Sequence, residues 1–411
     1  MKKLQGYCLG LLASTMLAGT AQAQATGSSA AAPSFDEGEI IVTAQRREER
    51  LIDVPIAVSA VNGAGLDRAG VQNLNNAQAL IPNIQINQTP GNSFSPLISI
   101  RGLAPAADTS LARDQPVGLY LDGVPVAKST GAAFDTVDLE RIEVLRGPQG
   151  TLYGKNTIGG AVRITSAPPS FDAISGRMSV TYGAYDRLDF QGSANIPLAS
   201  NFAIRLSGSS RNTDDLQKRY LDPTGAGQGN INQDAARLIA RWKPSDRLDI
   251  TVSGDYTRTR QHMAYGGNIQ YIPGASPLID VLNAEIFPGV ASSLGLPAGT
   301  VFDGRWSTAP KTSGATGPNS DDYDVWGVSG IIVYDLTPDI ALKSITAYRS
   351  VKGAAGRDGD SSPFAVVETI SADDNKQFSQ EFQLNGTSFA DRFKWTLGLY
   401  YIRENLENRI T

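Results

Sequence analysis

The second half of the chain alternates apolar and polar residues with the period of two that is typical of β-strands. Between residues 247 and 258, for example, Leu248, Ile250 and Val252 stand at every second position, with polar residues between them. The pattern recurs along the chain and predicts nine antiparallel strands. They cover residues 175–184, 187–196, 201–211, 234–242, 247–258, 324–335, 339–350, 376–387 and 391–403.

The connections between these predicted strands fall into two classes by length. The short ones are 197–200, 243–246, 336–338 and 388–391, and the long ones, rich in Gly, Pro, Ser and Asn, are 212–233, 259–322 and 351–375. Short turns on one side of a sheet and long loops on the other are typical of an outer-membrane β-barrel. A soluble β-sandwich also alternates apolar and polar residues, but it does not sort its loops by length in this way. The sequence therefore favours a transmembrane barrel.

Residues 53–167 mix strand and helix patterns. Strand-like apolar runs occupy residues 54–61, 97–103, 117–121, 124–126, 139–145 and 161–165. Asp122 and Gly123, between two of these runs, form a typical hairpin turn. The apolar positions of residues 64–81 recur near helical spacing, and Gly70 divides them into two short helices that end before Pro82. These patterns predict a small mixed α/β domain that precedes the barrel strands.

The N-terminus has the parts of a secretory signal peptide. A positively charged start is followed by an apolar run at 9–17 and by a small-x-small cleavage motif that ends at Ala23. Residues 1–23 are therefore predicted to be removed, and their apolar run is shorter than the roughly 20 residues that a membrane span needs. Residues 24–52 have the small, polar composition of a disordered linker.

One apolar strand interrupts this linker at residues 39–44, Glu-Ile-Ile-Val-Thr-Ala. Two interpretations are open on the residues alone. The segment is either an edge strand of the domain that follows, as its β-propensity suggests, or a recognition peptide that adds a strand to the sheet of a partner. In the second case main-chain hydrogen bonds would give affinity and alternate side chains would give specificity.

Composition excludes several classes of function. The 41 acidic residues outnumber the 36 basic ones, so that no basic excess indicates a nucleic-acid partner. The chain has a single histidine, His262, and a single cysteine, Cys8, which lies within the predicted signal peptide. This leaves no His or Cys constellation for metal binding or nucleophilic catalysis. We therefore predict no catalytic residue, no cofactor and no metal site.

Three weaker features are given structural interpretations. Residues 147–156 approach a phosphate-binding loop, but Gln149 and Asn156 stand where that motif requires Gly and Ser or Thr. Residues 357–361, Arg-Asp-Gly-Asp-Ser, lack the spacing of an EF-hand, so we expect a solvated turn rather than a calcium site. His262 is expected to be an exposed loop residue, with a contact to a solute as the alternative.

Ordered motifs across residues 39–166 resemble those of one family. They are Glu-Ile-Ile-Val-Thr-Ala at 39–44, Ile-Ser-Ile-Arg-Gly-Leu at 98–103, Val-Gly-Leu-Tyr-Leu-Asp-Gly-Val-Pro at 117–125, Leu-Glu-Arg-Ile-Glu-Val-Leu-Arg-Gly-Pro-Gln-Gly-Thr-Leu-Tyr-Gly at 139–154 and Gly-Gly-Ala-Val-Arg-Ile at 159–164. Together they resemble the TonB-dependent outer-membrane receptors. The resemblance implies a plug domain at 53–167 and, at 168–411, the N-terminal part of a transmembrane β-barrel.

The resemblance also implies a function, partners and site residues. In this family the box formed here by Glu39, Ile40, Ile41, Val42, Thr43 and Ala44 pairs with TonB, the protein that delivers inner-membrane energy. We therefore expect TonB-dependent import of a scarce solute, such as an iron–siderophore complex, by a barrel that outer-membrane lipid surrounds. The family further suggests that Arg101 and Arg146 reach carboxylates on the barrel wall, with Glu381 as one candidate.

Two other classes of function stay open. A passive porin or a plugged structural barrel would give residues 39–44 no role. A soluble periplasmic enzyme would have to work without a His, Cys or carboxylate constellation at catalytic spacing. The motifs do not identify the solute, because importers of siderophores, cobalamin, glycans and aromatic compounds share them.

The strand count suggests that the chain is a fragment. Bacterial barrels have even numbers of strands, because an unpaired edge in lipid is very costly. Plugged transporters have about 22 strands, and at the spacing seen here such a chain would run to roughly 700–750 residues. We therefore expect nine strands to be an incomplete barrel.

Overall fold

The computed structural model describes residues 41–47, 49–71, 74–89, 92–105, 114–126, 128, 137–222, 224–263, 271–306, 312–389 and 392–411. The predicted signal peptide and linker up to residue 40, which include Glu39 and Ile40, lie outside these ranges. Among the helices within them, none combines the length and the apolar character that crossing a membrane requires.

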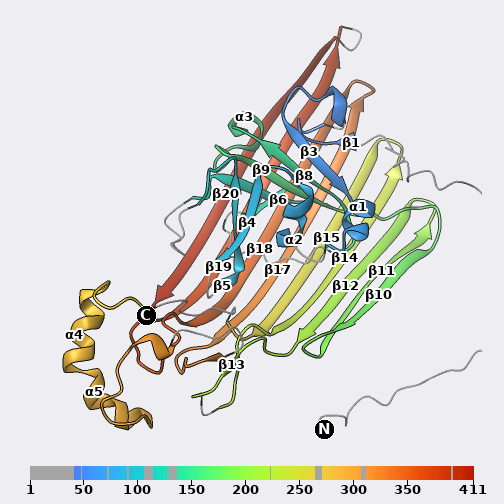
Figure 1. The fold of residues 1–411 in the computed structure, drawn as a ribbon. Helices are drawn as coiled ribbons and strands as arrows, with labels where there is room; N and C mark the ends of the chain where they lie inside the picture. Colours follow the sequence, from blue (N-terminus) through green and yellow to red (C-terminus); the bar gives the residue numbers. More distant parts are fainter. Residues whose placement is uncertain are drawn as a thin grey trace, which may run out of the picture. The chain divides into compact units, whose positions relative to one another are not determined.

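Nine long antiparallel strands form one sheet, in the order β10-β11-β12-β14-β15-β17-β18-β19-β20 (Figure 1). Their bounds are Ser175–Gly183, Arg187–Ala199, Phe202–Thr213, Ile231–Ser245, Leu248–Gln261, Ser320–Thr337, Ile340–Asp358, Glu368–Ser388 and Phe393–Ile410. Each strand pairs with the next one of this list along the chain, so the nine predicted strands and their antiparallel order are confirmed.

Several strands are longer than the apolar pattern predicts, at the ends next to the long loops. β18 continues to Asp358 and β19 begins at Glu368, whereas the pattern predicts 350 and 376. Most residues of the additional pairs are small or polar, as in the pair of Gly353 with Asp373. Backbone pairing thus continues beyond the point where the apolar alternation stops.

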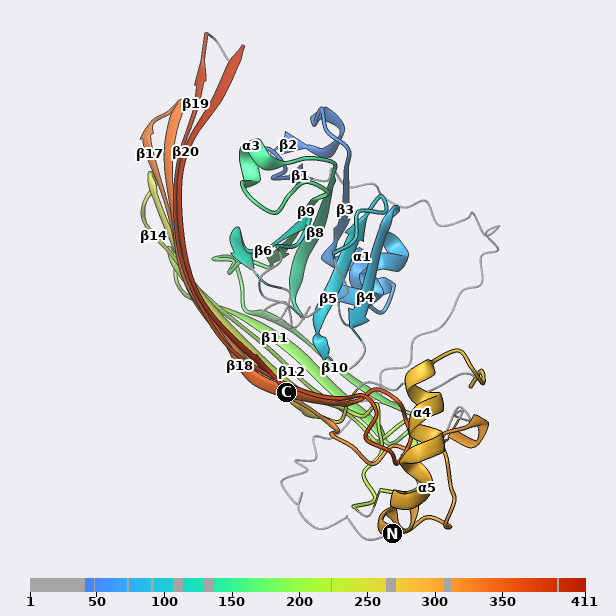
Figure 2. The same ribbon diagram turned by 90° about the vertical axis from the view of Figure 1, so that its left-hand side faces the viewer.

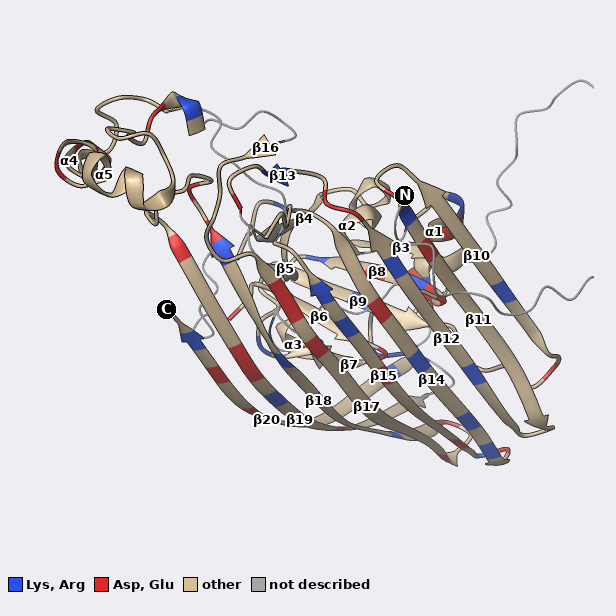
Figure 3. Cartoon of the chain, turned by 90° about the horizontal axis from the view of Figure 1, so that it is seen from below, with Lys and Arg blue, Asp and Glu red and all other residues tan. Residues whose placement is uncertain are grey.

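The two faces of this sheet have the reverse of the chemistry found in a soluble protein. On β19 the polar Gln377, Ser379 and Glu381 are 8%, 3% and 8% exposed, whereas Phe378 and Phe382, at the alternate positions, are 38% and 44% exposed. Charged residues appear on the strands as isolated bands in a mostly uncharged sheet (Figure 3). An apolar outer face and a polar inner face are typical of a barrel wall in lipid and argue against the β-sandwich.

A second, five-stranded sheet has the order β3-β8-β9-β6-β7 and lies on the concave side of the long sheet (Figure 2). Its strands are Val58–Asn62, Leu139–Arg146, Gly160–Ser166, Val117–Leu121 and Val124–Val126. Around it lie α1 (Gly63–Arg68), α2 (Leu74–Ala77), α3 (Gly150–Tyr153), the short 3₁₀ turns Leu51–Asp53 and Gln78–Leu80, and a hairpin of β4 (Ile84–Thr89) and β5 (Asn92–Ile100). The mixed α/β fold is confirmed, although the sequence pattern missed β4.

Both faces of the five-stranded sheet are buried, by different parts of the chain. Side chains such as Ile142 and Val162 point to one face and pack with residues of α1, α2, β4 and β5. Leu145 points to the other face, where it packs with Val42 and Ala44 of the N-terminal segment. That segment is therefore part of the core of the small domain.

The long loops are folded where the structure describes them. The loop after β15 contains α4 (Pro277–Glu285), α5 (Phe287–Val290) and the 3₁₀ turns Ala291–Leu294 and Gly304–Trp306. Two short strands, β13 (Lys218–Arg219) and β16 (Thr312–Ser313), pair in parallel between two of the loops. A small aromatic core of Phe287, Phe302, Trp306 and Phe364 joins the loop after β15 to the loop after β18.

Two expectations about loop residues are wrong. Residues 357–361 are not a solvated turn, because Asp358 and Asp360 are only 2% and 5% exposed and accept hydrogen bonds from backbone N–H groups, including that of Gly317 at 3.0 Å. His262 is half-buried rather than exposed, and its Nδ1 lies 2.6 Å from Oδ1 of Asp215. In both places a neighbouring loop supplies contacts that the local sequence does not reveal.

Candidate functional site

The described part of the predicted box, residues 41–44, is docked on the small domain. Ile41 and Val42 form β1, which pairs with β2 (Glu49–Arg50). Val42 and Ala44 are fully buried, whereas Ile41 is 40% exposed. The alternation of buried and exposed side chains is that of a strand whose inner face packs against a core.

Polar residues stand in one row beneath this segment because of the strand register. Glu143 on β8 lies opposite Arg163 on β9, and Arg163 in turn lies opposite Tyr120 on β6. Arg141 is two residues before Glu143 and therefore points to the same face. The fold thus brings two arginines, a carboxylate and a phenol to the face that contacts residues 41–46.

Glu143 is the centre of this polar cluster and is fully buried. Its carboxylate accepts hydrogen bonds from Nε of Arg141 at 2.6 Å, from a guanidinium nitrogen of Arg163 at 3.0 Å and from the backbone N–H of Thr43 at 3.0 Å. Arg163 also donates to the backbone carbonyl of Thr43 at 2.6 Å and to the Thr43 hydroxyl. Thr43 is therefore bound at its N–H, its carbonyl and its side chain by a charged pair.

Tyr153 of α3 holds the next residue of the segment. Its hydroxyl donates to the carbonyl of Ala44 at 2.9 Å, while its own carbonyl accepts from the hydroxyl of Tyr120 at 2.6 Å. Burial raises the pKa of Tyr120 to about 12 and also raises the pKa of Tyr153, because an ionised phenolate would lose its hydration there. Both hydroxyls therefore keep their protons, and act as donors, at any physiological pH.

Arg46 connects the segment to the barrel sheet. Its guanidinium lies 3.5 Å from the Glu381 carboxylate of β19, and the two side chains are only 8% and 10% exposed. Nε of Arg46 donates to the carbonyl of Leu152 at 3.0 Å, and the guanidinium lies 4.4 Å from the Tyr153 ring centroid and 5.6 Å from that of Tyr120. One side chain thus contacts the segment's own domain and the wall around it.

The structure places the other predicted ion-pair residues differently. Arg101 is exposed and sits in a turn with φ of +52°, and Arg146 is half-buried at the end of β8. Among the described residues, neither of them pairs with Glu381, whose partner is Arg46. Sequence reasoning overlooked Arg46, Arg163 and Glu143. Charged residues in the middle of otherwise apolar strands, as in Arg-Ile-Glu-Val at 141–144, are the signal that could have indicated them.

Further polar contacts join the small domain to the long sheet at separate points. Arg205 of β12 makes two hydrogen bonds of 2.6 Å to Asp138. Lys155 lies 2.8 Å from Glu404 of β20, and Gln377 of β19 donates to the carbonyl of Pro125 at 2.7 Å. The small domain is therefore held by several individual polar bonds and by a small apolar cluster of Val124 with Ile345 and Ala347 of β18.

The site offers docking chemistry rather than reaction chemistry. In the described ranges no three His, Cys, Asp or Glu side chains lie close enough together to bind a metal ion. The polar groups around Thr43 are already joined to one another and to the backbone of the segment. What the arrangement can do is hold residues 41–46 or, when its bonds break, release them.

Comparisons with known proteins agree with this architecture. Residues 50–161 match the family model described as the TonB-dependent receptor plug domain. The pesticin receptor of Yersinia pestis is 35% identical over 135 residues, which cover 33% of this chain and 19% of that protein. The vitamin B12 transporter BtuB of Vibrio vulnificus is 26% identical over 254 residues, which cover 59% of this chain and 39% of that protein.

Among solved structures, that of the ferric yersiniabactin uptake receptor FyuA from Yersinia pestis is similar, with a TM-score of 0.66 and 21% identity. The match covers 87% of this chain and 50% of FyuA, so the chain spans about half the length of that receptor. The plug-domain match and the reversed faces of the long sheet place the protein in the outer membrane. Residues 50–161 are therefore a TonB-dependent receptor plug domain, in a chain whose similarity to outer-membrane receptors extends into the barrel strands that follow.

Proposed function

We propose that the protein takes part in TonB-dependent uptake of a scarce solute across the outer membrane, and that residues 39–44 are its TonB box. The observation that carries this proposal is the docking of residues 41–46. They are bound to the plug domain through Thr43 and Ala44 and to the barrel sheet through Arg46. A box that must alternate between a hidden and an available state needs contacts of this reversible kind.

The docked segment cannot present its buried side chains to a partner. Val42 and Ala44 are fully buried, so a partner strand could read them only after the segment leaves the plug. Solute binding would favour the released state if the solute binds that state more tightly. TonB would then pair with the exposed strand by main-chain hydrogen bonds and transmit a pull to the plug.

The test compares a proline with an alanine at one position of the box. Ile41→Pro removes a backbone N–H that strand pairing uses, whereas Ile41→Ala keeps it. We expect the purified periplasmic fragment of TonB to bind the wild-type protein and the alanine variant, and to lose most of its affinity for the proline variant. Uptake by a deletion strain that expresses each variant should follow the same order.

Two outcomes would oppose the proposal. If the TonB fragment binds all three proteins equally, residues 39–44 are not the binding segment. If removal of residues 39–44 leaves uptake intact, the passive porin is the better description. Growth of the deletion strain on individual ferric siderophores, on cobalamin and on single carbon sources supplies the solute for these assays.

An iron–siderophore complex is our first choice of solute. A ferrioxamine B receptor of Salmonella typhimurium is 31% identical over 169 residues, and the structurally similar receptor FyuA is named for the uptake of ferric yersiniabactin. The BtuB transporter, which is named for vitamin B12, matches at lower identity over a longer stretch. Cobalamin is therefore the second solute to test.

A further inference from the structure

A row of aromatic side chains crosses the outward face of the long sheet near the long loops. It takes one residue from each of β15, β17, β18, β19 and β20, namely Tyr256, Trp326, Tyr348, Phe378 and Tyr401. Tyr256 lies opposite Trp326, and Tyr348 lies opposite Phe378. Between the other neighbours the row shifts by two residues, as expected for tilted strands. Aromatic girdles mark the interfaces of a transmembrane barrel, so this row marks the outer interface.

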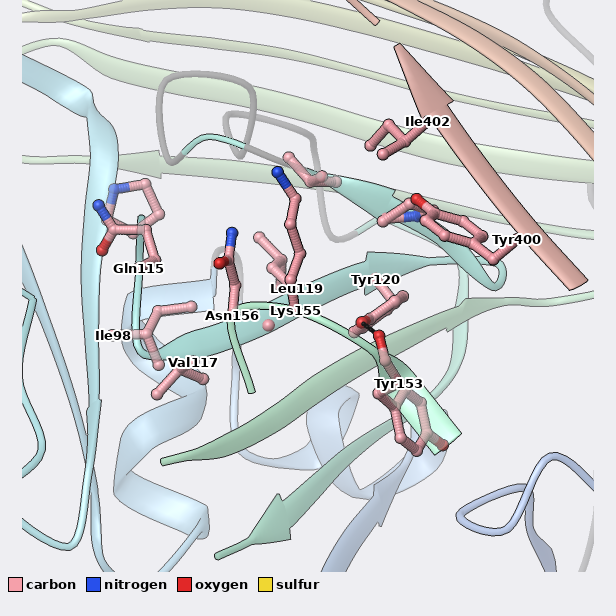
Figure 4. A pocket seen from close by; sticks show the side chains of 14 residues that line it. Ile98, Gln115, Val117, Leu119, Tyr120, Tyr153, Lys155, Asn156, Tyr400 and Ile402 are labelled. Atoms are coloured by element: carbon pink, nitrogen blue, oxygen red, sulfur yellow. Dashed lines mark hydrogen bonds between the residues drawn. The ribbon is translucent and has the colours of Figure 1, made fainter. Parts of the chain in front are cut away.

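Three cations stand on the outward face just beyond this row, on the side of the long loops. Tyr400 and Ile402 of β20 point toward the plug, as Figure 4 shows, so Arg403 lies on the opposite, outward face. By the same alternation the exposed Lys352 of β18 and Lys376 of β19 also lie outward. We call Lys352, Lys376 and Arg403 the basic cluster.

The strand register brings the members of the basic cluster close together. Lys376 lies opposite Ser350, which is two residues before Lys352, and Arg403 lies opposite Phe378, which is two residues after Lys376. Lys376 is therefore a diagonal neighbour of both other cations, at roughly 7–8 Å along the sheet. The long side chains of neighbouring cations at this spacing can donate to the oxygens of one phosphate group.

The basic cluster has an excess of positive charge that the adjacent strands lack. On β15 and β17 two arginines just beyond the aromatic row are matched by two aspartates: Arg258, Arg260, Asp322 and Asp324. In the basic cluster only Asp374 supplies a negative charge, 3.2 Å from Lys376, which leaves 3 − 1 = +2. Among the described residues, Lys352 and Arg403 have no ion-pair or hydrogen-bond partner. A doubly positive surface is therefore left uncompensated at head-group height.

We propose that the basic cluster binds the phosphate group of a lipid in the outer leaflet. Clusters of Lys and Arg at a membrane interface attract anionic head groups. Directly below the cluster the outward face continues with Phe378, Phe382 and Leu399, which are 38%, 44% and 70% exposed. Acyl chains can pack on this apolar surface, which offers nothing to a free phosphate ion. The site lies on the lipid side of the barrel wall and is independent of the proposed function of residues 39–44.

The experiment measures binding of lipid A, a lipid with two phosphates on its sugar head group, to the protein purified in an uncharged detergent. Native mass spectrometry counts the bound lipid at rising concentrations. Lys352→Gln and Arg403→Gln should each weaken binding about fivefold, and together about 25-fold, from the attraction that one cation exerts on an anionic lipid surface. Lys394→Gln, which changes an exposed lysine at the other end of β20, should leave binding unchanged.

A variant with the opposite effect guards against a purely structural explanation. Asp374→Asn removes the one negative charge of the site and frees Lys376, so it should strengthen binding of lipid A. Failure of Asp374→Asn to do so, or equal binding by Lys394→Gln and the double variant, overturns the site.

Two further measurements identify the group that is bound. Lipid A without its phosphates should bind the wild-type protein no better than lipid A binds the double variant. Wild-type affinity for this dephosphorylated lipid would show that the acyl chains alone are recognised, and it would overturn the phosphate site. Inorganic phosphate at the concentration of the lipid should not displace lipid A. Displacement by inorganic phosphate would show a site for a free ion and would overturn the assignment to lipid.

Discussion

Replacing Arg46 with methionine tests the contact that ties the box to the barrel sheet. Methionine keeps an unbranched side chain of similar length but removes the ion pair with Glu381, the hydrogen bond to the Leu152 carbonyl and the stacking on Tyr153. Arg47→Met is the matched control, because the Arg47 guanidinium bonds to Glu49 and Gln45 within the segment itself.

The expected magnitude follows from what Arg46 gains when the segment docks. A hydrogen bond from a charged donor contributes about 1.5–3 kcal/mol, and a buried cation–π contact about 0.5–2 kcal/mol. The buried ion pair adds little net free energy, since desolvation of both charges offsets their attraction. Loss of Arg46 should therefore weaken docking by about 2–3 kcal/mol, or roughly 30- to 150-fold in the ratio of docked to released protein.

The apparent affinity of the protein for the TonB fragment measures the ratio of docked to released protein. When only a small released fraction can bind, the apparent dissociation constant equals the intrinsic one divided by that fraction. Arg46→Met should therefore bind the fragment more tightly, by up to the same factor, and a spin label at residue 41 should become more mobile. Arg47→Met should leave both measurements unchanged.

The reasoning would be refuted by an Arg46→Met protein with wild-type fragment affinity and an immobile label. A double-mutant cycle with Glu381→Gln separates the ion pair from the other contacts. The two changes should be clearly non-additive if the pair couples the segment to the sheet, and additive if Arg46 acts only through Leu152 and Tyr153.

Three further predictions concern stability. Because the folded-state pKa of Tyr120 is raised to about 12, its contribution to stability is fully present below pH 10 and is lost as the pH rises toward 12. In Tyr120→Phe, the urea midpoint should therefore fall less between pH 10 and pH 12 than in the wild type. A midpoint that falls equally in both proteins would contradict the role of Tyr120. Gly160→Ala places a Cβ 2.2 Å from the Leu145 carbonyl oxygen, at φ of +142°, and should destabilise the plug by about 2 kcal/mol or more. Limited proteolysis should therefore cleave the variant faster than the wild type. Equal resistance of the two proteins would argue against this destabilisation. Arg349→Met leaves the Asp255 carboxylate, whose side chain is 13% exposed, without the guanidinium that donates to it at 3.0 and 3.1 Å. The variant should lose about 3–5 kcal/mol of stability in urea unfolding followed by tryptophan fluorescence. A loss below about 1 kcal/mol, roughly a fivefold change in the unfolding equilibrium, would argue against the pair.

The barrel sheet could be predicted from sequence because its requirements are local. A strand with one face toward lipid must place apolar residues at every second position, and a tight turn must follow within a few residues. The positions at which the strands end were harder to predict from the sequence. Beyond the apolar region, pairs such as Gly353 with Asp373 are held by backbone bonds that any residue can make. β4 was missed for another reason, because Ile84 and Ile86 are its only strongly apolar positions, although both are buried in the core.

The docking site could be predicted only in part, because its contacts join residues far apart in sequence. Residues 39–44 were predicted to be a docking strand from their apolar residues and motif. The anchors of this segment, Glu143 and Tyr153, lie about a hundred residues later, and their approach depends on strand register and on the position of α3. Similarly, no local feature shows whether Arg46, Arg101 or Arg146 reaches Glu381.

The pairing of β1 with β2 has a mechanical consequence. Ile41, at the N-terminal end of β1, pairs with Arg50, and Val42 pairs with Glu49. Tension applied ahead of residue 41 therefore peels the hairpin open from its free end, and it reaches Thr43 and then Arg46 only afterwards. Hydrogen bonds that are loaded one after another break at a lower force than bonds loaded together. A weak, sustained tension would therefore release residues 41–46 stepwise.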